Sequence, residues 1–235
     1  MATPPTFIAD FVVAWDTTTT PKTSASITTQ VGDVLVVVAA SETSTAAITL
    51  GNPTNTGTAE TWTANQPAAS GAHGTCWLWT TVCAVAQTMT VSVTRTSGVF
   101  NWGFDVLQYR GTDGVGASST TSITGTGAPS LGITTTTSNA AIVVVVSDWN
   151  AIDGASRTWR SVNGAAATEN VYFRNSSMYT VYVGRHPDAG AAGAKTVGLS
   201  APTGQTYQIS AVEIKGTAAA ALLPPLLIMQ TRRPY

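Results

Sequence analysis

Val34-Leu-Val-Val-Val-Ala-Ala40 is apolar at every position, and this run decides the fold class. A short run rich in β-branched residues is typical of a β-strand that is buried on both faces. A second run of this kind, residues 142–146, lies in the other half of the chain. The remaining strand-like segments up to residue 217 show mixed or alternating patterns, without the 3.6-residue periodicity of an amphipathic helix. The sequence therefore predicts an all-β fold.

The first run belongs to a longer pattern that occurs twice. Residues 26–41 return as residues 132–147, with the isoleucine, the threonines and the valine run in the same order. Three further matches keep this order: residues 61–63 with 158–160, 76–79 with 178–181, and 106–112 with 211–217. The repeat is longer than the 20–50 residues of a solenoid unit. It predicts two homologous halves, residues 24–112 and 130–217.

The segment that joins the halves, residues 111–127, is rich in Gly, Ser and Thr. This composition is compatible with a flexible linker between two domains or with a surface crossover inside one sandwich. We favour the crossover, because each half begins with a strand too apolar to lie at an exposed sheet edge. Residues 1–217 are thus expected to form one two-sheet sandwich of about 12–14 strands with a shared interior, followed by an extended tail at residues 218–235.

The chain carries little charge. Charged residues make up 10% of it, against roughly 25% in an ordinary soluble domain. The formal net charge of −1 provides no field for gathering phosphates, so nucleic-acid binding is not expected. Either neighbouring subunits cover much of the surface, or its threonines and serines alone keep the protein soluble.

No membrane or export signal is predicted. Residues 1–6 lack the basic and apolar regions of a signal peptide, so we expect the protein to fold in the cytoplasm of its host cell. The apolar stretch at residues 218–229 is broken by two prolines and is shorter than the ~20 residues that span a bilayer.

The sequence predicts neither an enzyme nor a metal or cofactor site. Cys76 and Cys83 have opposite parity in one strand-like run and lie about 23 Å apart, so they cannot form a disulfide. With His73 alone nearby, their spacing is poor for zinc. No catalytic motif surrounds His73 or His186, and the 12 carboxylates are scattered.

Residues 148–154, Asp-Trp-Asn-Ala-Ile-Asp-Gly, have a superficial likeness to a calcium loop. The second aspartate comes one position late, and no glutamate follows at the bidentate position. An ordinary Asp/Asn/Gly turn fits better, and the sequence leaves calcium binding open.

Among the seven tryptophans, Trp149 is the best candidate for a carbohydrate platform, because it ends a strand beside Asp148 and Asn150. The competing interpretation is a packed anchor of the loop. Trp62 and Trp159 occupy matching repeat positions, which favours packing between sheets for both.

Strand motifs across residues 24–217 resemble a recurring jelly-roll-like β-sandwich module of bacteria. These motifs are Gly-Asp-Val-Leu-Val-Val-Val at residues 32–38, Trp-Leu-Trp at 77–79, Thr-Val-Ser-Val-Thr at 90–94, Tyr-Arg-Gly-Thr-Asp at 109–113, Asn-Ala-Ala-Ile-Val-Val-Val-Val at 139–146 and Ala-Val-Glu-Ile-Lys at 211–215. Such modules occur in secreted bacterial surface proteins and in tail or capsid-surface proteins of actinobacterial phages. The resemblance implies fold and setting, and it carries no catalytic residues.

Residues 218–235 differ in composition from the repeat and resemble the apolar-then-basic tails of many actinophage virion proteins. Pro224 and Pro225 favour an extended path. Such a peptide could dock in a groove of another subunit or extend a sheet edge. Packing back on its own domain and disorder are the alternatives. The residues expected at an assembly interface are Leu222, Leu223, Leu226, Leu227, Ile228, Met229, Arg232, Arg233 and Tyr235.

These patterns predict a bacteriophage virion structural protein, either a minor tail protein or a capsid-surface decoration protein. We expect it to be a homo-oligomer in the particle, to contact other virion proteins, and to adhere weakly and multivalently to host glycans through Asp148, Trp149 and Asn150. The alternative is a lectin-like carbohydrate-binding module. The sequence does not distinguish tail from capsid placement.

Overall fold

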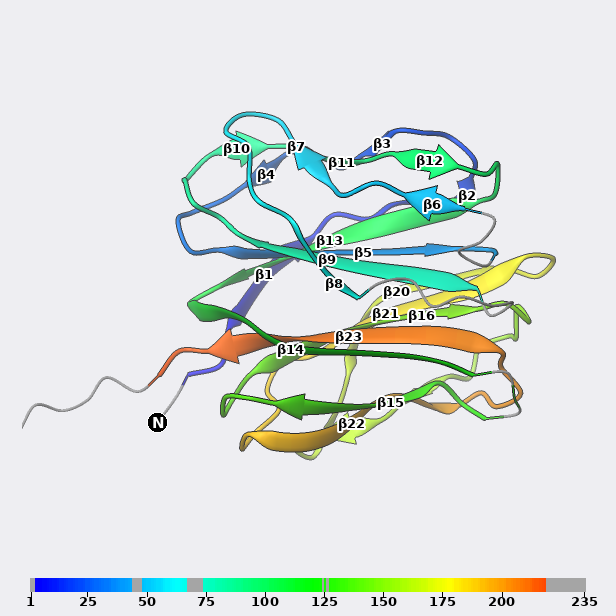
Figure 1. The fold of residues 1–235 in the computed structure, drawn as a ribbon. Helices are drawn as coiled ribbons and strands as arrows, with labels where there is room; N and C mark the ends of the chain where they lie inside the picture. Colours follow the sequence, from blue (N-terminus) through cyan, green and yellow to red (C-terminus); the bar gives the residue numbers. More distant parts are fainter. Residues whose placement is uncertain (1–2, 44–47, 67–73, 124, 126, 219–235) are drawn as a thin grey trace, which may run out of the picture.

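The all-β prediction is confirmed. A computed structural model describes residues 3–43, 48–66, 74–123, 125 and 127–218, and these residues form 23 strands and no helix. Figure 1 shows the strands in four stacked layers, with the two large sheets inside and one further layer outside each of them.

The first half of the chain forms one large sheet and an outer layer of short strands. The large sheet contains β1 (Thr6–Asp10), β2 (Val13–Thr17), β5 (Val34–Ser41), β8 (Thr63–Gln66), β9 (Thr75–Val82) and β13 (Trp102–Arg110). The outer strands are β3 (Lys22–Thr23), β4 (Ile27–Thr28), β6 (Thr49–Leu50), β7 (Thr54–Asn55), β10 (Thr88–Met89), β11 (Val91–Val93) and β12 (Arg95–Ser97).

The second half repeats this plan. Its large sheet contains β14 (Thr112–Ile123), β16 (Ala141–Asp148), β20 (Thr168–Asn175), β21 (Tyr179–His186) and β23 (Tyr207–Gly216). Its outer strands are β15 (Ser130–Thr135), β17 (Thr158–Trp159), β18 (Ser161–Val162), β19 (Ala165–Ala166) and β22 (Gly193–Ala201).

The two large sheets have the same strand order. The first follows β1-β13-β5-β9-β8 and the second follows β14-β23-β16-β21-β20, so that β5 and β16 occupy the same central place. Both central strands are buried at all eight positions. The valine runs therefore lie where their composition predicts, in strands with a core on each face.

Three hydrophobic cores fill the spaces between the four layers. The central core, between the two large sheets, takes alternate residues of their inner faces: Val34, Val36, Val38, Leu78, Leu107, Tyr109, Val143, Val145, Val181, Val183, Val212 and Ile214 are among them. Each outer core lies beneath one outer layer, and Trp62 and Trp159 pack in the first and the second of these, as predicted.

Two finer expectations need correction. The fold has four layers where two sheets and about 12–14 strands were expected, because each half adds its own outer layer to cover the second face of its central strand. Within the segment at residues 111–127, residues 112–123 form β14, which pairs with β23 at the edge of the second large sheet, so the expected surface crossover contains an edge strand.

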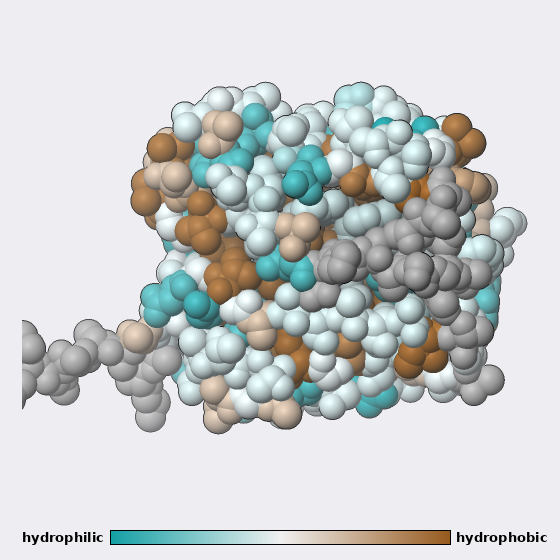
Figure 2. Space-filling view, viewed as in Figure 1, coloured by the Kyte–Doolittle hydropathy of each residue, from teal (hydrophilic) through white to brown (hydrophobic). Residues whose placement is uncertain are grey.

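Hydroxyl groups take the place of charges on the outer layer of the first half. Threonine and serine side chains bond across strands in the pairs Thr23–Ser92, Thr28–Thr88, Thr49–Thr96 and Thr56–Thr90. Cross-strand hydroxyl pairs of this kind stabilise a sheet without net charge. The face in Figure 2 is accordingly pale over most of its area, with scattered strongly polar or apolar patches.

Candidate functional site

The predicted platform lies at one end of the junction between the halves. Asp148 is the last residue of β16, and Trp149 and Asn150 form the turn that follows. Asp148 is fully buried, and its carboxylate accepts the backbone N–H groups of Asn150 and Ile152, each at 2.9 Å. Burial raises the pKa of Asp148 to about 6, although these N–H groups act in the opposite direction. Asp148 therefore shapes the turn and presents no carboxylate at the surface.

Asn150 fixes the same turn from the other side. Its Nδ2 donates to the carbonyl oxygen of Gly204 at 3.1 Å and to Oγ1 of Thr206 at 3.2 Å. The backbone N–H of Trp149 donates to the carbonyl oxygen of Thr206 at 2.9 Å. Asp148 is thus buried beneath the turn, whereas Trp149 and Asn150 are both exposed and Nδ2 of Asn150 is used within the turn.

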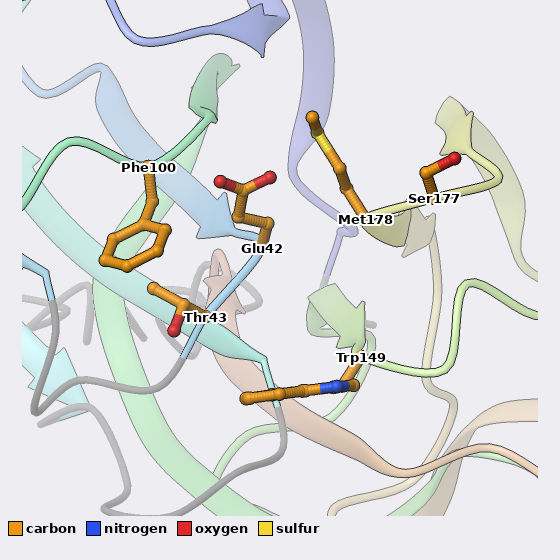
Figure 3. A pocket seen from close by; sticks show the side chains of 6 residues that line it. All are labelled: Glu42, Thr43, Phe100, Trp149, Ser177 and Met178. Atoms are coloured by element: carbon orange, nitrogen blue, oxygen red, sulfur yellow. The ribbon is translucent and has the colours of Figure 1, made fainter.

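Trp149 forms one wall of an open cleft of about 270 Å³. The six side chains that line it are labelled in Figure 3: Glu42, Thr43, Phe100, Trp149, Ser177 and Met178. Three come from the first half of the chain and three from the second, so neither half forms the cleft alone.

Glu42 is the charged group of this cleft. Its Oε1 accepts the backbone N–H of Asn101 at 3.0 Å, and its Oε2 accepts Nδ2 of Asn101 at 3.2 Å. The same Nδ2 lies 2.7 Å from the sulfur of Met178, which connects the first half to the second. Within the described part of the chain Glu42 forms no ion pair. Its carboxylate is therefore held in one orientation by neutral groups and keeps its negative charge unpaired.

The groups that line the cleft can contact a ligand that has both an apolar face and polar groups. They combine aromatic faces with a carboxylate and two hydroxyl-bearing residues, Thr43 and Ser177. Elsewhere, His186 is buried, and burial lowers its pKa to about 4. Burial raises the pKa of the Cys76 thiol to about 12, which leaves it protonated. The other histidine, His73, lies outside the described residues.

The loop of residues 148–154 uses its aspartates internally. Oδ1 of Asp153 accepts the backbone N–H of Ala155 and the hydroxyl of Tyr172, and its Oδ2 lies 3.6 Å from a guanidinium nitrogen of Arg174. Across the described ranges, no three His, Cys, Asp or Glu side chains come together in a way that could hold a metal ion. The loop has the geometry of an ordinary aspartate turn.

The predicted assembly residues, Leu222 to Tyr235, lie outside the described residues. The structure does show where the chain leaves the sandwich. Thr217 pairs with Thr3 in an isolated antiparallel bridge, and the N–H of Ala218 donates to Asp113 at 2.8 Å. Both ends of the described chain therefore lie side by side, next to the start of β14. A search of the described residues for a helix long and apolar enough to span a bilayer found none.

Sequence reasoning missed five of the six cleft residues, although the repeat contained a signal for one of them. Glu42 directly follows β5, and Trp149 directly follows the equivalent strand β16. Two large sheets that pack face to face bring these strand ends together. Phe100, Ser177 and Met178 lie in connections, which the strand pattern does not place.

Comparisons of the chain with models of known families, with curated proteins and with solved structures found no match.

Proposed function

We propose that this chain is a structural protein of a bacteriophage particle, displayed on its tail or capsid surface and attached through assembly contacts of residues 218–235. The observation that carries the proposal is the two-ended arrangement of the molecule. Both described chain ends lie at one end of the large sheets (Figure 1), and the Trp149 cleft lies at the opposite end, where β16 finishes.

The length of strand β16 gives the distance between the chain ends and the cleft. Its first residue, Ala141, pairs with Ile214 near the point where the chain leaves the sandwich, and its last residue precedes Trp149. Eight residues of extended strand cover about 25 Å. A chain that attaches by its terminus would thus present the cleft away from the particle, which suits a surface protein with an adhesive end.

The composition of the surface agrees with this proposal. The described residues form three ion pairs, and their outer strands use hydroxyl pairs instead. Such a surface lacks strong fields and tolerates close packing of many identical copies, whose weak contacts add up to avidity. The jelly-roll-like module that the strand motifs resemble occurs in proteins of the same setting.

Truncation tests the attachment. Deleting residues 219–235 should abolish co-purification of the chain with particles, measured by mass spectrometry, and should leave its thermal midpoint unchanged. Trp149→Ala, at the opposite end, is the matched control and should be incorporated normally. Normal incorporation of the truncated chain would contradict attachment by the tail, and absence of the full-length chain from particles would contradict the virion assignment.

A second candidate function is a lectin-like carbohydrate-binding module that acts without a particle. The exposed indole of Trp149 in a cleft with polar side chains favours it. A free module would bind glycans and would be absent from purified particles, so the same mass spectrometry separates the two functions.

A further inference from the structure

We infer that the cleft binds one neutral pyranose ring, which stacks on Trp149 and donates hydroxyl hydrogen bonds to Glu42. This inference rests on the adhesive part of the proposed function and assigns its ligand class. It does not use Asp148, which is buried, or Asn150, because neither of them lines the cleft.

The platform is the one exposed tryptophan of the chain. The side chain of Trp149 is 39% exposed, whereas the other six tryptophans are buried: Trp15, Trp62, Trp77, Trp79, Trp102 and Trp159. Its backbone is fixed by the Asp148 turn and by Thr206, so no backbone ordering is needed when a ligand stacks on the indole. The aromatic face of the indole matches the apolar face of a sugar ring.

Glu42 supplies the directional contacts. Each of its two carboxylate oxygens accepts one hydrogen bond from Asn101. An ionised carboxylate has about four lone-pair sites, so each oxygen can accept one more donor. Two adjacent hydroxyls of a pyranose ring can donate to such a pair of oxygens. Because Asn101 already orients the carboxylate, these bonds form without further ordering of the side chain.

The same charge selects against acidic ligands. A carboxylate, sulfate or phosphate on the sugar would lie close to the unpaired charge of Glu42, and like charges at such distances are unfavourable. The size of the cleft indicates how much of a ligand it contacts. Its volume of about 270 Å³ is near the lower end of ligand pockets, roughly 300–1,000 Å³, so its side chains contact about one sugar ring.

Saturation-transfer NMR on the full-length chain tests the inference, with methyl glucoside, methyl galactoside, methyl mannoside and methyl N-acetylglucosaminide as neutral probes. Methyl glucuronide is the acidic probe. We expect at least one neutral probe to bind with a Kd in the millimolar range and the glucuronide to bind about tenfold more weakly or not at all.

Variants separate the two contacts. Trp149→Ala should weaken neutral binding by about tenfold or more, and Trp149→Phe, which keeps an aromatic face, should stay within about threefold of wild type. Glu42→Gln should weaken neutral binding by about fivefold and remove the discrimination against the glucuronide. Val31→Ala is the control, because Val31 is 69% exposed and precedes β5 at the opposite end of the sheet.

The inference is wrong if no neutral probe shows saturation transfer to the wild-type chain, or if Trp149→Ala binds as wild type does. Preferential binding of the glucuronide would also overturn it. These results are independent of particle assembly: a chain that is incorporated into particles but binds no pyranoside refutes the site alone, and a chain that binds pyranosides but is absent from particles refutes the virion assignment alone.

Discussion

Replacing Glu213 by glutamine should destabilise the second half of the sandwich more than any surface change. Glu213 lies in β23, is fully buried, and accepts hydrogen bonds from the backbone N–H groups of Ala117, Thr136 and Thr137 at 2.9 Å each. The hydroxyls of the two threonines donate to it as well. One carboxylate therefore connects β23, the edge strand β14 and the turn that enters the central strand β16.

The magnitude follows from these donors. Glutamine turns one acceptor oxygen into an NH2 group, so at least one buried N–H loses its partner, at about 1–3 kcal/mol. About two remaining bonds lose their charge assistance, at about 1 kcal/mol each. The sum, about 3–5 kcal/mol, is a large part of the 5–15 kcal/mol that stabilises a typical protein. In a chain of this size it lowers the thermal midpoint by about 10 °C.

The assay is thermal unfolding followed by tryptophan fluorescence, with Lys215→Gln in the same strand as the control. The pH dependence adds a second readout. Burial alone would raise the pKa of Glu213, but the bonds from Ala117, Thr136 and Thr137 outweigh it and hold the pKa below 4.5. The contribution of Glu213 is therefore complete above pH 4.5 and is lost as the pH falls through its folded pKa, a loss that Glu213→Gln should not show. A midpoint within about 2 °C of wild type at pH 7 would refute the reasoning.

Three further changes follow the same logic. Asp33→Asn removes a buried carboxylate that pairs at 2.8 Å with the partly exposed Arg110, and the loss of these charge-assisted bonds should cost about 1–3 kcal/mol in urea unfolding. Gly184→Ala would place a Cβ 2.7 Å from the ring of Trp159, and the overpacked outer core should lose about 1–3 kcal/mol in the same assay. Burial, together with a neighbouring carboxylate, raises the pKa of Asp105 to about 7, so its burial costs stability progressively as the pH rises from about 4 to 7. Asp105→Asn should therefore be more stable than wild type at pH 8 and similar to it at pH 4, by calorimetry; equal midpoints at pH 8 would contradict this account.

The central strands and the tryptophan packing could be predicted because their signals are local. In a β-protein, a run that is apolar at every position is stable only as a strand with a hydrophobic core on both faces. Strands β5 and β16 lie in this environment. The outer layer could not be predicted in the same way. The described outer strands of the first half are all two or three residues long, too short for a period-two pattern, and they are defined by their partners in the fold.

The register of two repeat matches was wrong. The ladders pair Val37 with Val106 and Val144 with Ala211, which makes Val144 the counterpart of Val37, whereas the match of residues 26–41 with 132–147 assigns Val143 to it. Residues 76–79 were matched with residues 178–181, but the ladders pair Ser41 with Thr75 and Asp148 with Thr180, which makes Thr75 the counterpart of Thr180. The proposed match would set Trp77, in the outer core, against Tyr179, in the central core. A shift by an odd number of residues exchanges the faces of a strand, and a pattern of large apolar residues on both faces does not reveal it.

In each half a buried carboxylate fixes the turn that leads into the central strand, but the two carboxylates come from different positions. In the first half Asp33 accepts the N–H of Gln30 and the side chain of Gln108 just before β5 begins. In the second, Glu213 accepts the N–H groups of residues 136 and 137 just before β16 begins. By the strand ladders Gln108 and Glu213 occupy equivalent positions. The carboxylate that fixes the turn thus lies before the central strand in the first half and on the neighbouring strand in the second.

These two turn-fixing carboxylates, the anchors, lie at the end where the chain leaves the sandwich, about 25 Å from the cleft. Substitutions at the anchors should therefore change stability and leave pyranoside affinity intact, whereas substitutions at Trp149 should do the reverse, because sites this far apart with no shared partners act additively.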